Sequence, residues 1–184
     1  MALINQSDVE ARLQRTLTAE EASAFTTINA AAQAYVEQII GSSVEQAVES
    51  TRYYDGGVQH LAIDPCTDVT AVKYVDDDTT VEYTFDTTDY TLEPVNGTLK
   101  TMVRHRPGRM TTGINNIAVV AKFSIYGDSK TLAIVKNALI GFLVSEVQNS
   151  SNIKRESIEG YSIEFATTES MAALSPINYL FPEV

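Results

Sequence analysis

The first forty residues carry apolar side chains at the spacing of amphipathic helices. Thr18-Ala19-Glu20-Glu21 has the form of a capping box, and Gly41 suits the end of the helix that this box would begin. Ser7-Asp8-Val9-Glu10 has the same form and predicts a shorter helix that ends near Arg15. Between Thr18 and Gly41 the apolar positions share one face of the predicted helix: Ala22, Phe25, Ile28, Ala32, Tyr35, Val36, Ile39 and Ile40.

From about residue 44 to residue 126 the apolar period changes to that of strands. Turn sequences interrupt this region at Asp55-Gly56-Gly57, Asp76-Asp77-Asp78, Asn96-Gly97 and Pro107-Gly108. Asn96-Gly97 is typical of a tight hairpin turn. The runs between these turns predict antiparallel strands over residues 47–54, 58–63, 69–75, 80–85, 90–93, 98–103 and 117–126.

A long helix with apolar residues on most of its circumference follows. Asp128 or Ser129 is its predicted N-cap. A helix that is apolar on most sides must be enclosed by its own domain or by neighbouring subunits. Polar residues interrupt the run, and we expect it to fall short of the ~20 apolar residues of a membrane span. The apolar positions are Leu132, Ile134, Val135, Ala138, Leu139, Ile140, Phe142, Leu143, Val144 and Val147.

These patterns predict an α+β fold. A small helical bundle, made of the N-terminal helices and the long apolar helix, carries an inserted antiparallel sheet and an extended C-terminal arm. The predicted divisions are residues 1–43 and 128–165 for the bundle, 44–127 for the insertion and 166–184 for the arm. With 184 residues and 44% apolar content, the chain can bury a core of its own.

The net charge of −11 is unevenly distributed. Residues 64–93 are strongly acidic, and a basic stretch from Lys100 to Arg109 follows directly. Overall acidity argues against nucleic-acid binding, because affinity for phosphate comes from Lys and Arg. The basic stretch could still be a nucleic-acid patch or a solvated loop, but we favour head-to-tail contact between copies, which closes into a ring. The candidate subunit-interface residues are Arg104, Arg106, Arg109, Asp76, Asp77 and Asp78.

The C-terminal arm ends in an apolar cluster. Chain termini are usually polar and poorly ordered unless something holds them. The cluster therefore predicts docking, either on the chain's own domain or on a partner. Its residues are Ile177, Tyr179, Leu180 and Phe181.

Residues that could support catalysis are few. His60 and His105 are the only histidines, and neither lies in a metal-binding or nucleophile pattern. Cys66 is the single cysteine, and we interpret it as a buried thiol. No phosphate-binding glycine loop or nucleophile elbow occurs. We therefore expect neither an enzyme nor a bound metal or cofactor.

One segment after the long helix is the most distinctive part of the chain. It is Ile153-Lys154-Arg155-Glu156-Ser157-Ile158-Glu159-Gly160-Tyr161-Ser162-Ile163-Glu164-Phe165. Together with the order of the predicted elements, it resembles the head–tail connector (adaptor or head-completion) proteins of tailed bacteriophages. The resemblance covers nearly the whole chain.

The resemblance implies a structural role in the virion, at the head–tail junction. Copies assembled in the host cytoplasm would form a ring of about twelve beneath the portal protein. The ring would extend the DNA channel, pass the genome without specific binding and offer a platform to a stopper or tail protein. We expect the apolar terminal cluster to bind the portal. The alternatives are a stopper or tail-completion protein and an acidic monomeric binding or enzymatic domain.

Overall fold

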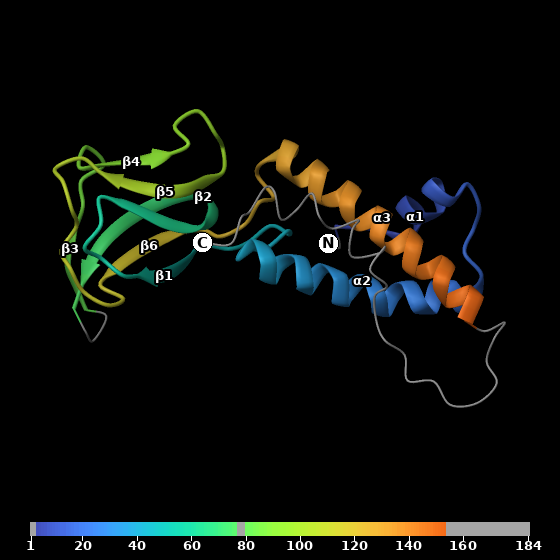
Figure 1. The fold of residues 1–184 in the computed structure, drawn as a ribbon. Coiled ribbons are helices and arrows are strands. Elements are labelled where there is room, and N and C mark those ends of the chain that lie inside the picture. Colours follow the sequence, from blue (N-terminus) through green and yellow to red (C-terminus); the bar gives the residue numbers. More distant parts are fainter. Residues whose placement is uncertain (1–2, 77–79, 154–184) are drawn as a thin grey trace. The chain divides into compact units, whose positions relative to one another are not determined.

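The computed structural model describes residues 3–76 and 80–153, which divide into two compact units (Figure 1). We call Met1–Ile40 with Ser129–Val184 the helical unit, and Gly41–Asp128 the β unit. Because one unit is helical and the other is an antiparallel sheet inserted between its helices, the predicted α+β fold class is confirmed.

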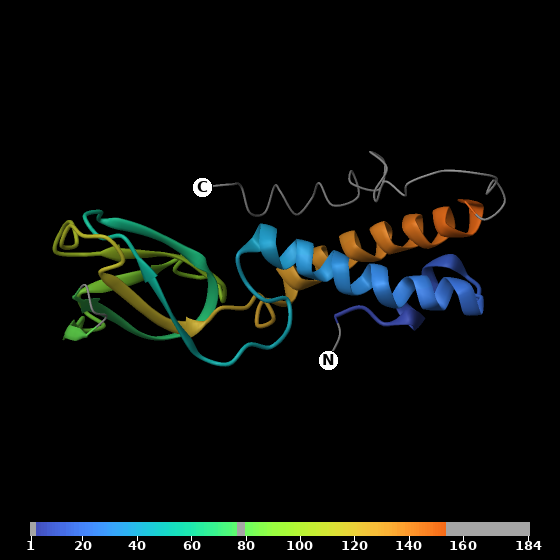
Figure 2. The ribbon, with the colours of Figure 1, turned by 90° about the horizontal axis from the view of Figure 1, so that it is seen from below.

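Three helices make up the described part of the helical unit: α1 (Gln6–Leu13), α2 (Ala19–Ile40) and α3 (Ser129–Ile153). The helices α2 and α3 run antiparallel and lie side by side in two perpendicular views (Figures 1 and 2). Helix α1 packs on α3. The buried apolar residues of this unit are Ile4, Val9, Phe25, Ala32, Val36, Ile40, Val135, Ala138, Leu139, Phe142, Leu143 and Val147.

The predicted start and end of α2 are confirmed. The Glu21 backbone N–H donates to Thr18 Oγ1 at 3.2 Å, and the Thr18 backbone N–H donates to Glu21 Oε2 at 2.9 Å. This reciprocal pair is a capping box. Gly41 follows the last helical residue with φ +72°, in the left-handed region where a glycine ends a helix without steric cost.

The predicted start of α1 is wrong by two residues. The helix begins at Gln6, so Asn5 is its N-cap and Ser7 lies inside the first turn. The Asn5 backbone N–H donates to Asp8 Oδ2 at 2.9 Å. Asp8 stands three residues after Asn5, which is the spacing that a reciprocal cap requires. Asn5 and Asp8 therefore take the roles that the sequence pattern assigned to Ser7 and Glu10.

The described residues of the β unit form one antiparallel sheet with six strands. The strand order is β1-β6-β2-β5-β4, and β3 pairs with β2 beside this path. The strands are β1 (Ser50–Tyr54), β2 (His60–Val75), β3 (Val81–Thr84), β4 (Tyr90–Glu93), β5 (Lys100–His105) and β6 (Ile117–Lys122).

Strand β2 corrects the sequence prediction of two separate strands over residues 58–63 and 69–75. It is continuous over 16 residues but irregular in its middle, where the register shifts and Asp68 has φ +48°. Its first part pairs with β5, and its last part pairs with β6 and β3. Pro65 suggests a break because proline cannot donate to a ladder, but bulged positions tolerate it. The irregular middle therefore joins two pairing regions within one strand.

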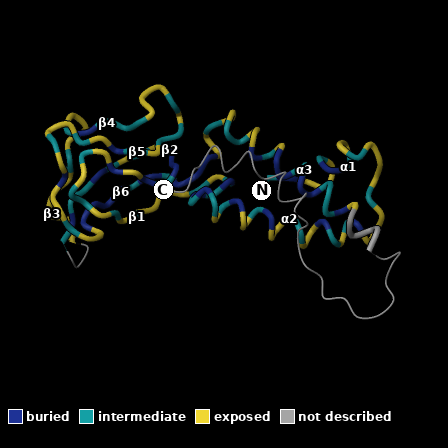
Figure 3. Tube along the Cα trace, viewed as in Figure 1, coloured by how far each residue is buried: buried dark blue, intermediate teal, exposed yellow. Residues whose placement is uncertain are grey.

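The core of the β unit is closed by the unit's own strands. Strand β6 is buried at most of its positions, so residues facing both sides of the sheet are covered (Figure 3). The predicted hairpin between β4 and β5 is confirmed, although residues 94–99 form a longer connection than a two-residue turn. The buried cluster contains Leu61, Ile63, Cys66, Val72, Tyr90, Val103, Met110, Ile117, Val119, Ala121 and Phe123.

The β unit begins and ends with two adjacent segments. The Ser43 backbone N–H donates to the Phe123 carbonyl at 3.2 Å, and the Ile125 N–H donates to the Ser43 carbonyl at 3.0 Å. Ser43 and Ser124 also form an isolated parallel bridge. The segments that follow Gly41 and precede Asp128 are thereby held together by backbone hydrogen bonds.

Candidate interaction surfaces

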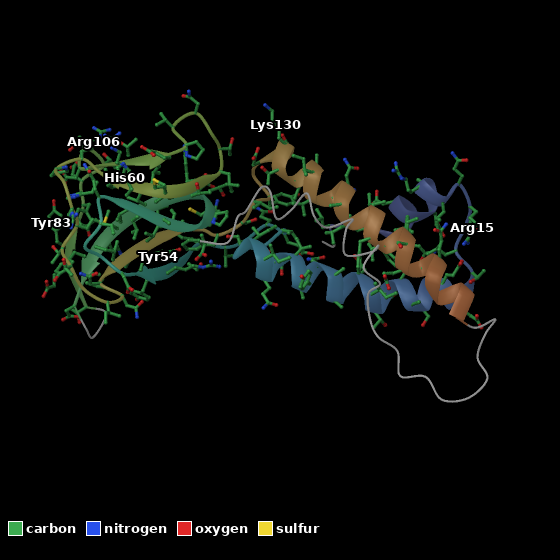
Figure 4. The ribbon with its side chains drawn as sticks, in the orientation of Figure 1. Arg15, Tyr54, His60, Tyr83, Arg106 and Lys130 are labelled. Carbon is green, nitrogen blue, oxygen red and sulfur yellow. The ribbon has the colours of Figure 1, made fainter. Side chains whose placement is uncertain are left out.

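Two of the predicted basic interface residues lie close together on the β unit. Arg104 on β5 stands opposite His60 on β2 and Thr91 on β4, so the three residues share one face of the sheet. Arg104 Nη1 lies 3.8 Å from Glu93 Oε1, and Arg106 Nε donates to Thr91 Oγ1 at 2.8 Å. Figure 4 labels His60 and Arg106 in the part of the unit that carries β4 and β5. These residues form an exposed, mainly basic surface.

The remaining predicted interface residues lie outside these strands or outside the described residues. Arg109 is exposed in the connection between β5 and β6. The Asp76 carboxylate accepts the Thr80 backbone N–H at 2.8 Å and helps to close the β2–β3 turn. The other predicted interface residues, which include the whole apolar terminal cluster, lie outside the described residues: Asp77, Asp78, Ile177, Tyr179, Leu180 and Phe181. The distinctive segment that follows Ile153 lies there as well.

Sequence patterns did not indicate a polar cluster where the β unit begins. Arg52 Nη1 lies 2.6 Å from Asp64 Oδ2, and its guanidinium stands 4.3 Å above the centre of the Phe123 ring. Arg52 also donates to the Gly41 carbonyl. The Tyr54 hydroxyl, labelled in Figure 4, donates to Asp64 Oδ2 at 2.9 Å. The cluster fixes the backbone at Gly41, where a Cβ atom would approach Asp64 Oδ1 to 2.8 Å.

The chemistry of this cluster is structural rather than reactive. Burial raises the pKa of the Tyr54 hydroxyl, and burial raises the pKa of the nearby Cys66 thiol to about 12. Both groups therefore stay protonated at neutral pH, whereas a nucleophilic cysteine needs a lowered pKa. Cys66 is buried, as the sequence analysis predicted. Among residues 3–76 and 80–153, no group of three His, Cys, Asp or Glu side chains could hold a metal ion.

A rigid loop presents an exposed apolar residue at the other end of β1. Asn116 Oδ1 accepts the Gly56 N–H at 2.8 Å, and Asp55 Oδ1 accepts the Asn115 N–H at 2.8 Å. Ile114, which directly precedes Asn115, is 79% exposed. The hydrogen bonds join the β1–β2 connection to the segment before β6, so Ile114 projects from an ordered support.

Within the described residues, helix α3 is buried on the side that α1 and α2 cover. Val135, Leu139 and Leu143 are fully buried, whereas Ile134 is 41% exposed. Buried and exposed segments alternate along α3 in Figure 3. The sequence pattern predicted an enclosed helix, but the described residues leave an apolar side uncovered. We call this side the α3 outer face. It comprises Ala133, Ile134, Asn137, Ile140, Gly141 and Val144, which are exposed or partly exposed.

The same helix contains the stretch Ser129–Gln148, which is long and apolar enough to cross a membrane by length and composition, with a mean hydropathy of 1.3. By length and composition, therefore, the expectation that this helix is too short and too polar for a membrane span is wrong. A buried core helix can also meet this criterion. Here 33% of the stretch is buried, and Lys136 Nζ lies 3.1 Å from Asp8 Oδ1 on α1.

Helix α2 presents a different outer surface. From Ala22 to Val36 it contains no charged residue. Directly after Ala34, the bulkier Tyr35 is 42% exposed. The exposed positions between Ser23 and Ala34 are all small, and we call them the α2 outer face. They are Ser23, Thr26, Thr27, Ala30, Ala31 and Ala34.

A groove of about 550 Å³ lies along the helical unit. Asp8, Ala11 and Arg12 of α1 and Asn137 and Ile140 of α3 line it. The backbone N–H of Asn5, and then Lys136, lower the pKa of the Asp8 carboxyl. The lining of the groove therefore combines apolar and charged side chains, and Ile140 and Asn137 also belong to the α3 outer face.

Comparisons with known proteins identify the fold. No protein-family model matches the chain, and no curated protein matches its sequence. Among solved structures, a chain of the neck of an empty gene transfer agent (GTA) particle computed with C6 symmetry matches with a TM-score of 0.54 and 14% identity. The match covers 95% of this chain and 88% of the neck chain. The two chains therefore share a fold over nearly their whole lengths.

Two further chains come from related particles. One belongs to the neck of the native GTA particle computed with C12 symmetry, with a TM-score of 0.46, 17% identity and coverage of 95% and 90%. The other belongs to the virion of the native GTA particle, with a TM-score of 0.48, 18% identity and coverage of 95% and 88%.

Proposed function

We propose that this chain is a structural connector at the head–tail junction of a tailed phage or phage-like particle, in the position of an adaptor. The observation that carries the proposal is the fold that it shares with a GTA neck chain over 95% of its length. The sequence resemblance to phage head–tail connectors supports the same role. Two long helices, of 22 and 25 residues, favour an adaptor over a β-dominated stopper.

The proposed assembly is a ring beneath the portal. The neck that contains the matching chain was computed with C6 symmetry, which accommodates six copies or a multiple of six. We propose about twelve copies, each presenting different surfaces to its two neighbours, because only such head-to-tail contacts close into rings. The ring would continue the DNA channel and offer a platform to a stopper or tail protein.

Charge supports this assignment. Each copy carries a net charge of −11, so the ring would have a negative potential. Phosphate groups bind where Lys and Arg neutralise them, and an acidic channel would let DNA slide without adsorbing. In this proposal the Arg104, Arg106 and Arg109 side chains face Asp76, Asp77 and Asp78 of the next copy.

The C-terminal arm is the proposed portal anchor. Apolar and aromatic side chains that become fully desolvated supply most of the affinity in many interfaces. Ile177, Tyr179, Leu180 and Phe181 provide such a cluster in the sequence.

A gene deletion with complementation tests this function. Without the gene, we expect DNA-filled heads that lack tails, and the full chain should restore tailed particles with density at the neck in electron micrographs. A chain that lacks residues 175–184 should fold, as judged by circular dichroism, but should fail to restore tails. Tailed, infectious particles from the deletion strain would overturn the proposed function. Restoration by the truncated chain would overturn only the role of the arm.

A further inference from the structure

The helical unit has two exposed faces, of which the α3 outer face has large side chains and the α2 outer face has small ones. The α3 outer face carries protruding aliphatic side chains, of which Ile134, Ile140 and Val144 are the largest. The α2 outer face carries only small side chains between Ser23 and Ala34. Small residues let a second helix approach closely, to interaxial distances of about 8–10 Å. One face is therefore suited to receive the side chains of the other.

The two faces also point away from each other. Ala30 and Ala34 lie on the side of α2 opposite the buried Val36, and Ile134 lies on the side of α3 opposite the buried Leu139. Since α2 and α3 pack on each other, one copy cannot bring its own outer faces together. A contact between them requires two copies, and each copy keeps one free face for the next. This is the condition for a head-to-tail ring.

Both faces can lose water at little electrostatic cost. Burying an unpaired charge is expensive. The α2 outer face has no charged residue, and Asn137 is the only strongly polar residue that we assign to the α3 outer face. The nearby Lys136 is already paired with Asp8.

We propose that adjacent copies contact each other by placing the α3 outer face of one copy on the α2 outer face of the next. This inference rests on the proposed function, because it adds a helix contact to the charged contact between copies of the proposed ring. The occupant of the α3 outer face is thus a second copy of this chain. A lipid surface would require only the aliphatic face and would leave the small-residue face without a role.

Disulfide trapping with the full chain tests the contact, because it captures even weak encounters. One variant carries Ala30→Cys and the other carries Ile134→Cys, while the native Cys66 is buried. Mixed under oxidising conditions at high protein concentration, they should form mixed disulfide dimers several-fold faster than either variant mixed with Val48→Cys. Val48 is the matched control, since it is 83% exposed and lies in the β unit.

Three outcomes would overturn the inference. Mixed dimers no more abundant than with Val48→Cys would show that the faces do not meet. Dimers formed mainly by Ile134→Cys alone would show that α3 pairs with α3. Vesicle binding that is lost on Ile134→Asp, without any mixed dimer, would assign the face to lipid.

Complementation separates this inference from the proposed function. Ile134→Asp should fail to restore tailed particles, whereas Val95→Asp, at a site that is 65% exposed in the β unit, should restore them. If Ile134→Asp restores a normal neck, the function stands and the proposed surface is wrong. If the mixed disulfide forms but the deletion strain makes normal tails, the contact stands and the proposed function is wrong.

Discussion

Strand β6 of the β unit and helix α3 of the helical unit bury their apolar residues to different extents. In the β unit, Val72, Ile117 and Val119 are fully buried, and β6 is covered on both sides of the sheet. In the helical unit, Leu139 and Leu143 are fully buried, but Ile134 on the same helix is 41% exposed. Strand β6 is therefore covered on both sides, while the described residues leave one side of α3 uncovered.

This difference indicates that some apolar residues stabilise the folded monomer and that others are available for contacts with another molecule. A residue in a closed core affects folding, since removing it leaves a cavity. An aliphatic residue on an uncovered helix face contributes little to the folded monomer and much more to a contact that excludes water. Substitutions in the two units should therefore separate folding from assembly, and the following predictions test that separation.

The largest expected effect compares two isoleucines. Ile117→Ala should lower the free energy of unfolding by about 2–5 kcal/mol, because Ile117 is fully buried. Ile134→Ala should change it by no more than about 0.5 kcal/mol, because Ile134 is 41% exposed. Urea unfolding of dilute protein, followed by circular dichroism and tyrosine fluorescence, measures both values. Equal losses would show that Ile134 belongs to a closed core and would remove the distinction.

A smaller effect concerns the polar support of the Ile114 loop. Asn116→Ala removes the acceptor of the Gly56 N–H and the donor to the Thr111 carbonyl, at 2.8 and 3.0 Å. The Gly56 N–H keeps the Gly113 carbonyl as an acceptor at 2.9 Å, and Thr111 is exposed, so each lost hydrogen bond should cost about 0.5–1.5 kcal/mol. We expect a loss in that range for the β unit, with faster amide exchange at Gly56. Asn96→Ala, at an exposed position, is the control and should change neither quantity.

The smallest effect is an acid sensitivity of the helical unit. Hydrogen bonds from Arg15 at 2.7 and 2.8 Å, then that from the Thr18 N–H, lower the pKa of the buried Glu21 carboxyl to about 2. Because the folded-state pKa lies below that of the unfolded chain, this contribution is complete above about pH 4.5 and is lost as the pH falls towards 2. The amount should be about 1 kcal/mol, since Arg15 is partly exposed.

Thermal unfolding at several pH values measures this contribution. Glu21→Gln should lower the melting temperature at neutral pH and flatten its decline below about pH 4.5. Glu20→Gln, at the exposed neighbouring position, is the control and should keep the wild-type decline. An unchanged acid profile in Glu21→Gln would mean that the pair with Arg15 adds nothing to stability.

Local patterns were sufficient to predict the parts of the fold that local physics determines. Thr18 and Gly41 marked the ends of α2 correctly because capping depends on neighbours within one turn. The same reasoning misplaced the start of α1, since Asn5 and Asp8 form an equivalent pair. The continuity of β2 depends on strand order, and Pro65 makes a single strand look like two.

The candidate surfaces were less predictable for a related reason. Arg52 and Asp64 meet although β1 and β2 do not pair with each other, and no spacing along the chain encodes that contact. Helical periodicity showed that α3 is apolar on most sides, but it could not show which side α2 covers. Arg104 and His60 became neighbours only through the register of β2 and β5.

The hydrogen bonds of Ser43 to Phe123 and Ile125 have a consequence for how such a chain can diversify. Because the first and last segments of the β unit are adjacent, a change in the size of this unit need not change the distance between the helix ends that it connects. Gly41–Asp128 can therefore be exchanged, enlarged or trimmed as a cassette, while the interval between Ile40 and Ser129 stays constant. Particles that meet different partners could share one helical platform and vary only the inserted module.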